Sequence, residues 1–193
     1  MNLSAMILSG GKSSRMGQDK ASLKWKQTGM LEHLAEELKC DGISEVFISV
    51  AHEGDYAKTG LPLCVDENWE IGPMEGIRRG LYYAKEEYLF VCAVDMPFVT
   101  GKTALYLEGL IRPEYNAYVF RENERIHPVC AIYHKSVLPV IETQVREGNY
   151  KLSELLLRVN TLYADLEKSG LDRNSLVNVN TPEEYAKLLN SRE

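Results

Sequence analysis

The run Tyr88-Leu-Phe-Val-Cys-Ala-Val94 is apolar throughout and shows no polar alternation. A strand with one face in water alternates apolar and polar side chains, so a strand of this composition must be covered on both faces. Parallel sheets that lie between two layers of helices provide that environment. The run therefore predicts an α/β fold with a mainly parallel sheet.

The rest of the chain repeats this pattern of strands and crossover helices. Short apolar runs rich in β-branched or aromatic residues alternate with segments of helical period. Strands are predicted at about 3–9, 45–51, 61–65 and 88–94, and helices at about 30–39, 74–85 and 103–111. The sequence thus predicts a three-layer α/β/α, Rossmann-like core.

After residue 115 the pattern changes. Two strand-like runs, 116–122 and 125–134, flank a tight turn and predict a mixed or antiparallel edge of the sheet. Further elements are predicted in the order helix 135–147, helix 151–158, strand 160–164 and strand 175–180. A last helix is expected after Thr181, with Pro182 at its first position and Glu184 completing a capping box.

Composition and charge restrict the possible partners. The 193 residues are 45% hydrophobic and 26% charged, which is typical of one globular domain, with a net charge of −6. That charge disfavours nucleic acid as a partner. Residues 1–30 nevertheless carry a net charge of +4, so the cationic part of the chain favours a small anionic ligand such as a polyphosphate.

The cysteines and the first residues predict a cytoplasmic protein. Four cysteines without a C-x-x-C pair, mostly among apolar neighbours, indicate reduced, buried thiols rather than disulfides or a zinc site. The first apolar stretch, of about five residues, is too short for a signal sequence or a membrane span. No long apolar stripe remains once the core is placed, which favours a monomer.

The segment Leu8-Ser-Gly-Gly-Lys-Ser-Ser-Arg-Met-Gly-Gln-Asp-Lys20 follows the first predicted strand directly. Adjacent glycines allow backbone N–H groups to turn toward an anion, and three cationic side chains surround them, which predicts a phosphate cradle. It is not a Walker A loop, because Met6 stands where that motif requires glycine, and its glycine spacing does not fit G-x-G-x-x-G. The alternative is an ordinary solvated loop.

Two carboxylates follow predicted strands, where ligands of open α/β sheets bind. Asp95 is a candidate ligand for Mg²⁺, with a turn cap before Pro97 as the alternative. Asp66 is a candidate acceptor for a base or a ribose hydroxyl, with a hydrated turn as the alternative. Gly72 and Gly76 follow it and are expected to permit close approach of the backbone to a ligand.

Candidate residues for a second substrate lie in the later part of the chain. His127 precedes a proline and has two arginines nearby, so it is a candidate for an anionic substrate, with a structural hydrogen bond as the alternative. Asn178 and Asn180 would share one face of a strand and could bind the edge of a heterocycle. Turn formation before the last helix is their alternative role.

Taken in order, these motifs resemble those of the MobA family, the molybdenum cofactor guanylyltransferases. The motifs are L-S-G-G-x-S-x-R-M-G-x-D-K, V-D…G-P-M-E-G, V-D-M-P-F, E-R-I-H-P and N-V-N-T-P-E-E, and the resemblance covers residues 5 to about 188. It implies a nucleotidyltransferase fold and transfer of GMP from GTP, with Mg²⁺, to molybdopterin or molybdenum cofactor, releasing pyrophosphate. It also implies a nucleotide-binding half, about 1–100, and an acceptor-binding half, about 101–193.

The resemblance implies roles for individual residues. Catalytic roles fall on Arg15, Lys20 and Asp95, with Asp95 also binding the metal. Nucleotide binding falls on Leu8, Ser9, Gly10, Gly11, Lys20, Asp66 and Asp95, and acceptor binding on His127, Asn178 and Asn180.

The chain departs from the family pattern at two positions, where Ser9 replaces an alanine and Glu75 adds an acid near the nucleotide. Other reactions therefore stay open: a molybdopterin cytidylyltransferase, a sugar-phosphate nucleotidyltransferase, or a nucleotide-binding module without catalysis. Other cofactor-biosynthesis or molybdoenzyme-maturation proteins are further candidate partners.

Overall fold

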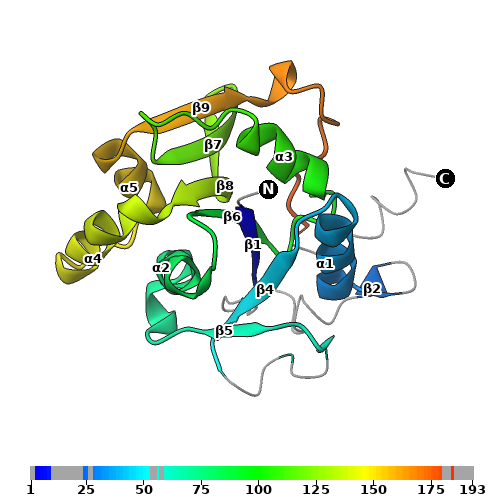
Figure 1. Ribbon diagram of the computed structural model, residues 1–193, viewed down its shortest axis with the longest axis horizontal. Helices are drawn as coiled ribbons and strands as arrows, with labels where there is room; N and C mark the ends of the chain where they lie inside the picture. Colours follow the sequence, from blue (N-terminus) through cyan, green and yellow to red (C-terminus); the bar gives the residue numbers. More distant parts are fainter. Residues whose placement is uncertain are drawn as a thin grey trace.

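A seven-stranded sheet forms the centre of the molecule (Figure 1). The computed structural model describes residues 3–9, 24–25, 28–52, 56, 59–179 and 184. Across the sheet the strands are β5 (Leu63–Val65), β4 (Glu45–Val50), β1 (Leu3–Leu8), β6 (Tyr88–Ala93), β8 (Arg125–His134), β7 (Ala117–Glu122) and β9 (Thr161–Asp165). A separate small ladder joins β2 (Lys24–Trp25) to β3 (Thr28–Gly29).

Strand β8 runs antiparallel to both of its neighbours, whereas the other adjacent strands of this sheet pair in parallel. The two-residue turn between β7 and β8 enforces this direction, and Asn123 in that turn has a φ of 54°. The helices that follow β8 then carry the chain past β7, so that β9 adds in parallel at the edge. The mixed sheet is confirmed, but the antiparallel strand lies inside the sheet and not at its edge.

Helices cover both faces of the sheet, as the apolar strands require (Figure 1). On one face lie α1 (Met30–Cys40) and α3 (Gly101–Glu108), whose buried residues join the core cluster that includes Phe90 and Phe120. On the other lie α2 (Pro73–Tyr83), α4 (Leu138–Arg146) and α5 (Leu152–Arg158), which pack with Phe47 and Tyr133. Short 3₁₀ turns are η3 (Trp69–Ile71), η4 (Lys135–Val137) and η5 (Leu166–Lys168). The predicted α/β/α architecture is confirmed.

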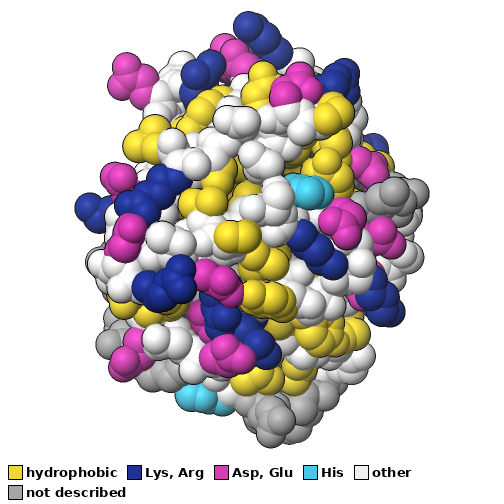
Figure 2. Space-filling model, turned by 60° about the vertical axis from the view of Figure 1, so that its left-hand side comes forward, with side chains coloured by type: hydrophobic (Ala, Val, Ile, Leu, Met, Phe, Trp, Pro, Cys, Tyr) yellow, Lys and Arg dark blue, Asp and Glu magenta, His cyan; other side chains and the backbone are white. Residues whose placement is uncertain are grey.

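The outer surface of the second helical layer is mixed in character (Figure 2). The exposed aromatic side chains Tyr82 and Tyr83 lie on α2, and Leu157 of α5 is 75% exposed. Figure 2 shows basic and acidic side chains among the apolar ones on this face. Among the described residues, no helix is both long and apolar enough to span a membrane.

Two details of the sequence prediction are wrong. Cys40 is exposed at the end of α1, because the final residue of that helix projects beyond the core, whereas Cys64, Cys92 and Cys130 are buried free thiols as expected. Residues 177–179 form no strand, because the chain turns at 173–176 and Val179 donates its N–H to the backbone oxygen of Asp95. The predicted last helix, after Thr181, lies largely outside the described residues, so it stays a prediction.

Candidate active site

The candidate site lies at the carboxyl end of β1, in the middle of the sheet. From β1 the sheet continues through β4 and β5 on one side and through β6 on the other, which makes this a topological switch point. The backbone oxygen of Leu8 accepts the N–H of Val94 at 3.0 Å, and the N–H of Ser9 donates to the oxygen of Ser49 at 3.2 Å. These bonds join the ends of three neighbouring strands.

Ser9 is the last described residue before the predicted phosphate cradle. Its hydroxyl donates to the backbone oxygen of Ser49 at 2.6 Å, so the serine adds a bond that an alanine there could not make. The Ser9 N–H is therefore already bonded within the sheet, whereas the Leu8 carbonyl oxygen, which accepts one hydrogen bond, retains a second lone pair for a ligand. Gly10, Gly11, Arg15 and Lys20 lie outside the described residues, and their roles stay predictions.

Asp66 directly follows β5, as predicted, and is held from two sides. Its N–H donates to the oxygen of Val50 at 2.9 Å, and its Oδ1 accepts the hydroxyl of Ser49 at 3.0 Å. Burial raises the pKa of Asp66 to about 6, and the nearby carboxylate of Glu75 adds to the rise. The hydrogen bond from Ser49 and the charge of Arg79 act in the opposite direction. The carboxyl group thus changes its charge just below neutral pH.

Asp95 follows β6 and lies next to Asn178, although 83 residues separate them in the sequence. The Asn178 side-chain N–H points to Oδ1 of Asp95 at 3.5 Å, and the Val179 backbone N–H donates to the Asp95 backbone oxygen at 2.7 Å. One predicted metal ligand and one predicted acceptor-binding residue are therefore neighbours. Asn180 lies outside the described residues.

A single carboxylate at a strand end suits Mg²⁺, which binds proteins through one or two carboxylates together with waters and substrate phosphates. Asp95 offers such an oxygen ligand, and the side-chain N–H of the adjacent Asn178 points to one of its oxygens at 3.5 Å. Within the described ranges, no group of three or more His, Cys, Asp or Glu residues could form a metal site of its own. The donor chemistry of Asp95 fits the predicted ion.

His127 is buried in β8, with 4% of its surface exposed, and pairs with Phe120 of β7. Among the described residues its Nε2 makes no hydrogen bond, although Oε2 of Glu122 lies 3.8 Å away. Burial lowers the pKa of His127, as does the charge of Arg125, whereas the carboxylate of Glu122 acts in the opposite direction. The role of His127 in acceptor binding stays a prediction.

The two glycines after Asp66 differ in their surroundings. A Cβ on Gly72 would meet no described atom within 4 Å, so close approach of a ligand there stays a prediction. Gly72 has a φ of 71°, a conformation that allows the chain to turn into α2. A Cβ on Gly76 would lie 2.4 Å from Cδ2 of Leu8 and 2.8 Å from Oγ of Ser49. The space beside Gly76 is therefore filled by the protein itself, and the expectation of close contact with a ligand was wrong there.

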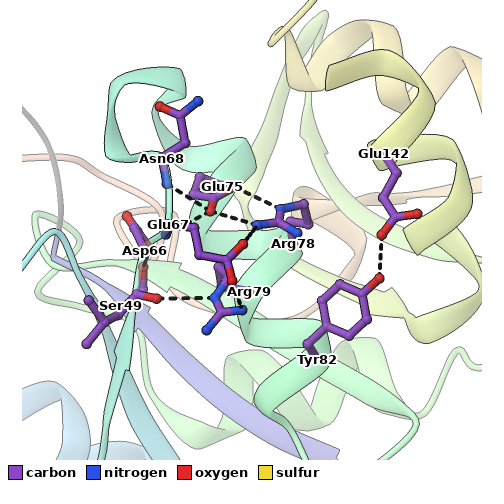
Figure 3. Close-up of polar contacts among 10 residues, drawn as sticks. Ser49, Asp66, Glu67, Asn68, Glu75, Arg78, Arg79, Tyr82 and Glu142 are labelled. Carbon is purple, nitrogen blue, oxygen red and sulfur yellow. Dashed lines mark hydrogen bonds and ion pairs between the residues drawn. The ribbon is translucent and has the colours of Figure 1, made fainter. Parts of the chain in front are cut away.

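Glu75 makes contacts that the sequence did not predict. The extra acid was expected to face the nucleotide, but its side chain is 1% exposed and accepts hydrogen bonds from the loop after Asp66 and from Arg78 (Figure 3). The spacing of Glu75 and Arg78, three residues apart on a helix, was the available signal.

Comparison with known proteins identifies the family. The family model described as the MobA-like NTP transferase domain matches residues 5–162. The chain belongs to the MobA-like NTP transferase family. The resemblance in the sequence motifs is thereby confirmed, and the protein is a nucleotidyltransferase by family.

Named relatives extend over nearly the whole chain. The "Probable molybdenum cofactor guanylyltransferase" of Clostridium perfringens is 32% identical over 196 residues, covering 98% of each chain. The molybdenum cofactor guanylyltransferase of Vibrio parahaemolyticus is 30% identical over 182 residues, covering 94% of this chain and 92% of its own.

Solved structures of MobA-like NTP transferases and other nucleotidyltransferases share the fold. Molybdopterin-guanine dinucleotide biosynthesis protein A from Archaeoglobus fulgidus superposes with a TM-score of 0.83 at 22% identity, covering 98% of this chain and 100% of its own. The 2-C-methyl-D-erythritol 4-phosphate cytidylyltransferase from Thermus thermophilus gives 0.71 at 16% identity, covering 100% of both. These two structures show that the fold of this chain is shared with proteins of 22% and 16% sequence identity.

Proposed function

We propose that this protein transfers GMP from GTP to the terminal phosphate of molybdopterin or molybdenum cofactor, forming its guanine dinucleotide and releasing pyrophosphate. The observation that carries the proposal is the arrangement of Asp66, Asp95 and Asn178 around the end of β1 in a MobA-like chain. The named guanylyltransferases cover almost the same length.

In this proposal Asp66 binds the guanosine. Guanine presents two neighbouring donors, N1–H and N2–H₂, which suit a carboxylate, whereas cytosine presents one amino donor beside a carbonyl. The other two carboxylates at this loop are already bonded: that of Glu75 to Arg78 and to backbone amides, and that of Glu67 to Arg78 and Arg79. Asp66 is therefore the carboxylate that we assign to the nucleoside.

The reaction brings two anions together. An oxygen of the acceptor phosphate attacks the α-phosphorus of GTP, the bond from that phosphorus to the α–β bridging oxygen breaks, and pyrophosphate leaves with the electron pair. Catalysis of this kind depends on positioning and on neutralising charge. We assign the phosphates to Arg15 and Lys20, and the acceptor to Asn178, Asn180 and His127.

Mg²⁺ is the proposed cofactor, and Asp95 is the residue that would hold it. When bound, the ion supplies positive charge to the phosphate oxygens of the nucleotide. Asn178 donates to Oδ1 of Asp95 and so orients the carboxylate. We further propose that the protein works in the cytoplasm, with residues 1–100 serving the nucleotide and 101–193 the acceptor.

The test is release of pyrophosphate by the purified protein with Mg²⁺, each of the four nucleoside triphosphates, and molybdopterin present or absent. Release that requires both GTP and molybdopterin is the expected result. Release with CTP would reassign the protein to cytidylyl transfer. Tight binding of GTP without any release would leave only a nucleotide-binding module.

A further inference from the structure

Glu75 is a buried carboxylate at the third position of α2, after Pro73 and Met74. A carboxylate removed from water must find hydrogen-bond donors within the protein, and the first turn of a helix favours negative charge. Burial alone would raise the pKa of Glu75, but hydrogen bonds from Arg78 and from two backbone amides outweigh it and hold the pKa below its ordinary value. The side chain is therefore an ionised anchor.

Both oxygens of this anchor are occupied (Figure 3). Oε1 accepts the backbone N–H groups of Glu67 and Asn68 at 3.0 and 3.1 Å, and Nη2 of Arg78 at 2.9 Å. Oε2 accepts Nε of Arg78 at 2.9 Å. Because Glu75 is also 1% exposed, a base edge has no open access to this carboxylate, so Glu75 does not contact the nucleotide directly.

The two amides that Glu75 binds belong to the first two residues after Asp66. On the other side of Asp66, the backbone oxygen of Val65 accepts Nε of Arg79 at 3.2 Å. Arg79 also contacts Oε1 of Glu67 at 2.7 Å, and Arg78 binds the other oxygen of the same carboxylate at 2.5 Å. Helix α2 thus fixes the backbone on both sides of Asp66.

We infer that Glu75 is a positioning residue for nucleotide specificity, which holds the loop 66–68 on α2 so that the carboxylate of Asp66 meets the donors of the guanosine. The inference rests on the proposed function, because it takes Asp66 as the nucleoside-binding group. It also gives the departure from the family pattern at position 75 a physical meaning: the acid there holds the backbone near the base and is not a second recognition group.

The experiment compares GTP affinity, KM and kcat in Glu75→Ala and Glu75→Gln, each made also in an Asp66→Ala background. Glu75→Ala should weaken GTP binding about tenfold, the equivalent of one hydrogen bond to a charged group, with kcat changed less than about twofold. Glu75→Gln keeps the shape and one amide-accepting oxygen, and should restore part of the affinity. In the Asp66→Ala background, Glu75→Ala should change affinity less than about twofold.

Glu142→Ala is the matched control. Glu142 of α4 also accepts a hydrogen bond from α2, from the hydroxyl of Tyr82, but on the side away from Asp66 (Figure 3). This variant should bind GTP as the wild type does. The inference would be overturned if Glu75→Ala weakened GTP binding by the same factor in the wild-type and the Asp66→Ala backgrounds. It would also be overturned if Glu75→Ala lowered kcat and left the affinity for GTP unchanged.

Hydrogen exchange separates this inference from the proposed function. The amides of Glu67 and Asn68 should be protected in the wild type and should exchange faster in Glu75→Ala, with no nucleotide present. Unchanged protection would refute the anchoring of the loop. A wild-type protein that binds no nucleoside triphosphate would instead refute the proposed function, while the exchange rates would still report on the anchor.

Discussion

In the proposed role of Asp66, nucleotide binding should weaken as the pH falls through about 6, because only the ionised carboxylate can accept a hydrogen bond from guanine on each of its two oxygens. Burial raises the pKa of this carboxyl group to about 6 in the protein without ligand. The charged form binds, so affinity is retained above that pH and lost below it. An unperturbed aspartate would lose its charge only near pH 4.

The size of the effect follows from the fraction of Asp66 that is ionised. If only the ionised form binds, the apparent Kd for GTP rises about tenfold between pH 7.5 and pH 5. Removing the hydrogen bond from Ser49, which lowers the pKa, should move the midpoint to higher pH. Ser49→Ala should therefore lose affinity earlier than the wild type during acidification.

Calorimetric titration with GTP and Mg²⁺ at a series of pH values would measure this dependence. The terminal phosphate of GTP titrates in the same range, so the useful quantity is the ratio of the Kd of Asp66→Asn to that of the wild type at each pH. The ratio should fall toward acid pH, because asparagine does not titrate. A ratio that stays constant from pH 5 to pH 7.5 would refute the assignment of Asp66.

Four further substitutions test other parts of the structure. Lys20→Ala and Asp95→Asn should each slow pyrophosphate release at least about 10²-fold with unchanged melting temperature, and wild-type rates from either would refute the assigned roles. Gly76→Ala should lower the free energy of unfolding by about 1–3 kcal/mol in urea titrations, because its Cβ would overlap Leu8; unchanged stability would show that the core yields there. Tyr133→Phe should lower the free energy of unfolding by about 1–2 kcal/mol in the same assay, because the buried Tyr133 hydroxyl donates to the backbone oxygen of Pro128 at 2.7 Å. Unchanged stability would show that this hydrogen bond contributes nothing to the fold.

The architecture could be predicted because the strands themselves carry its signal. Runs such as Tyr88–Ala93 lack polar residues, and only a sheet covered on both faces buries them. The hairpin at Asn123 was predictable for the same reason, because its two strands and its turn are adjacent in the sequence. The internal position of β8 was not predictable in this way. It depends on β9, which pairs with β7 at the edge of the sheet after the two intervening helices, and no local sequence pattern indicates that pairing.

The positions of candidate site residues could be predicted where a residue directly follows a strand. Asp66 and Asp95 follow β5 and β6, so the parallel sheet brings them to one edge. The function of Glu75 was not predictable, because a carboxylate can face a ligand or a loop, and the choice depends on which backbone amides turn toward it. The prediction that a ligand approaches Gly76 was wrong for a similar reason. The side chain that fills the space beside Gly76 is that of Leu8, 68 positions away in the sequence, and no local pattern indicates this contact.

The order of the strands sets the distance across the site. Asp66 and Asp95 follow β5 and β6, which are separated by β4 and β1, and three strand spacings amount to about 14 Å. Backbone hydrogen bonds of the sheet fix that span, so changes in the connecting loops leave it nearly constant. If Asp66 and Asp95 have the roles proposed above, the length of nucleotide that fits between them is therefore set by the sheet, and substitutions in the loops can alter base preference without altering that length.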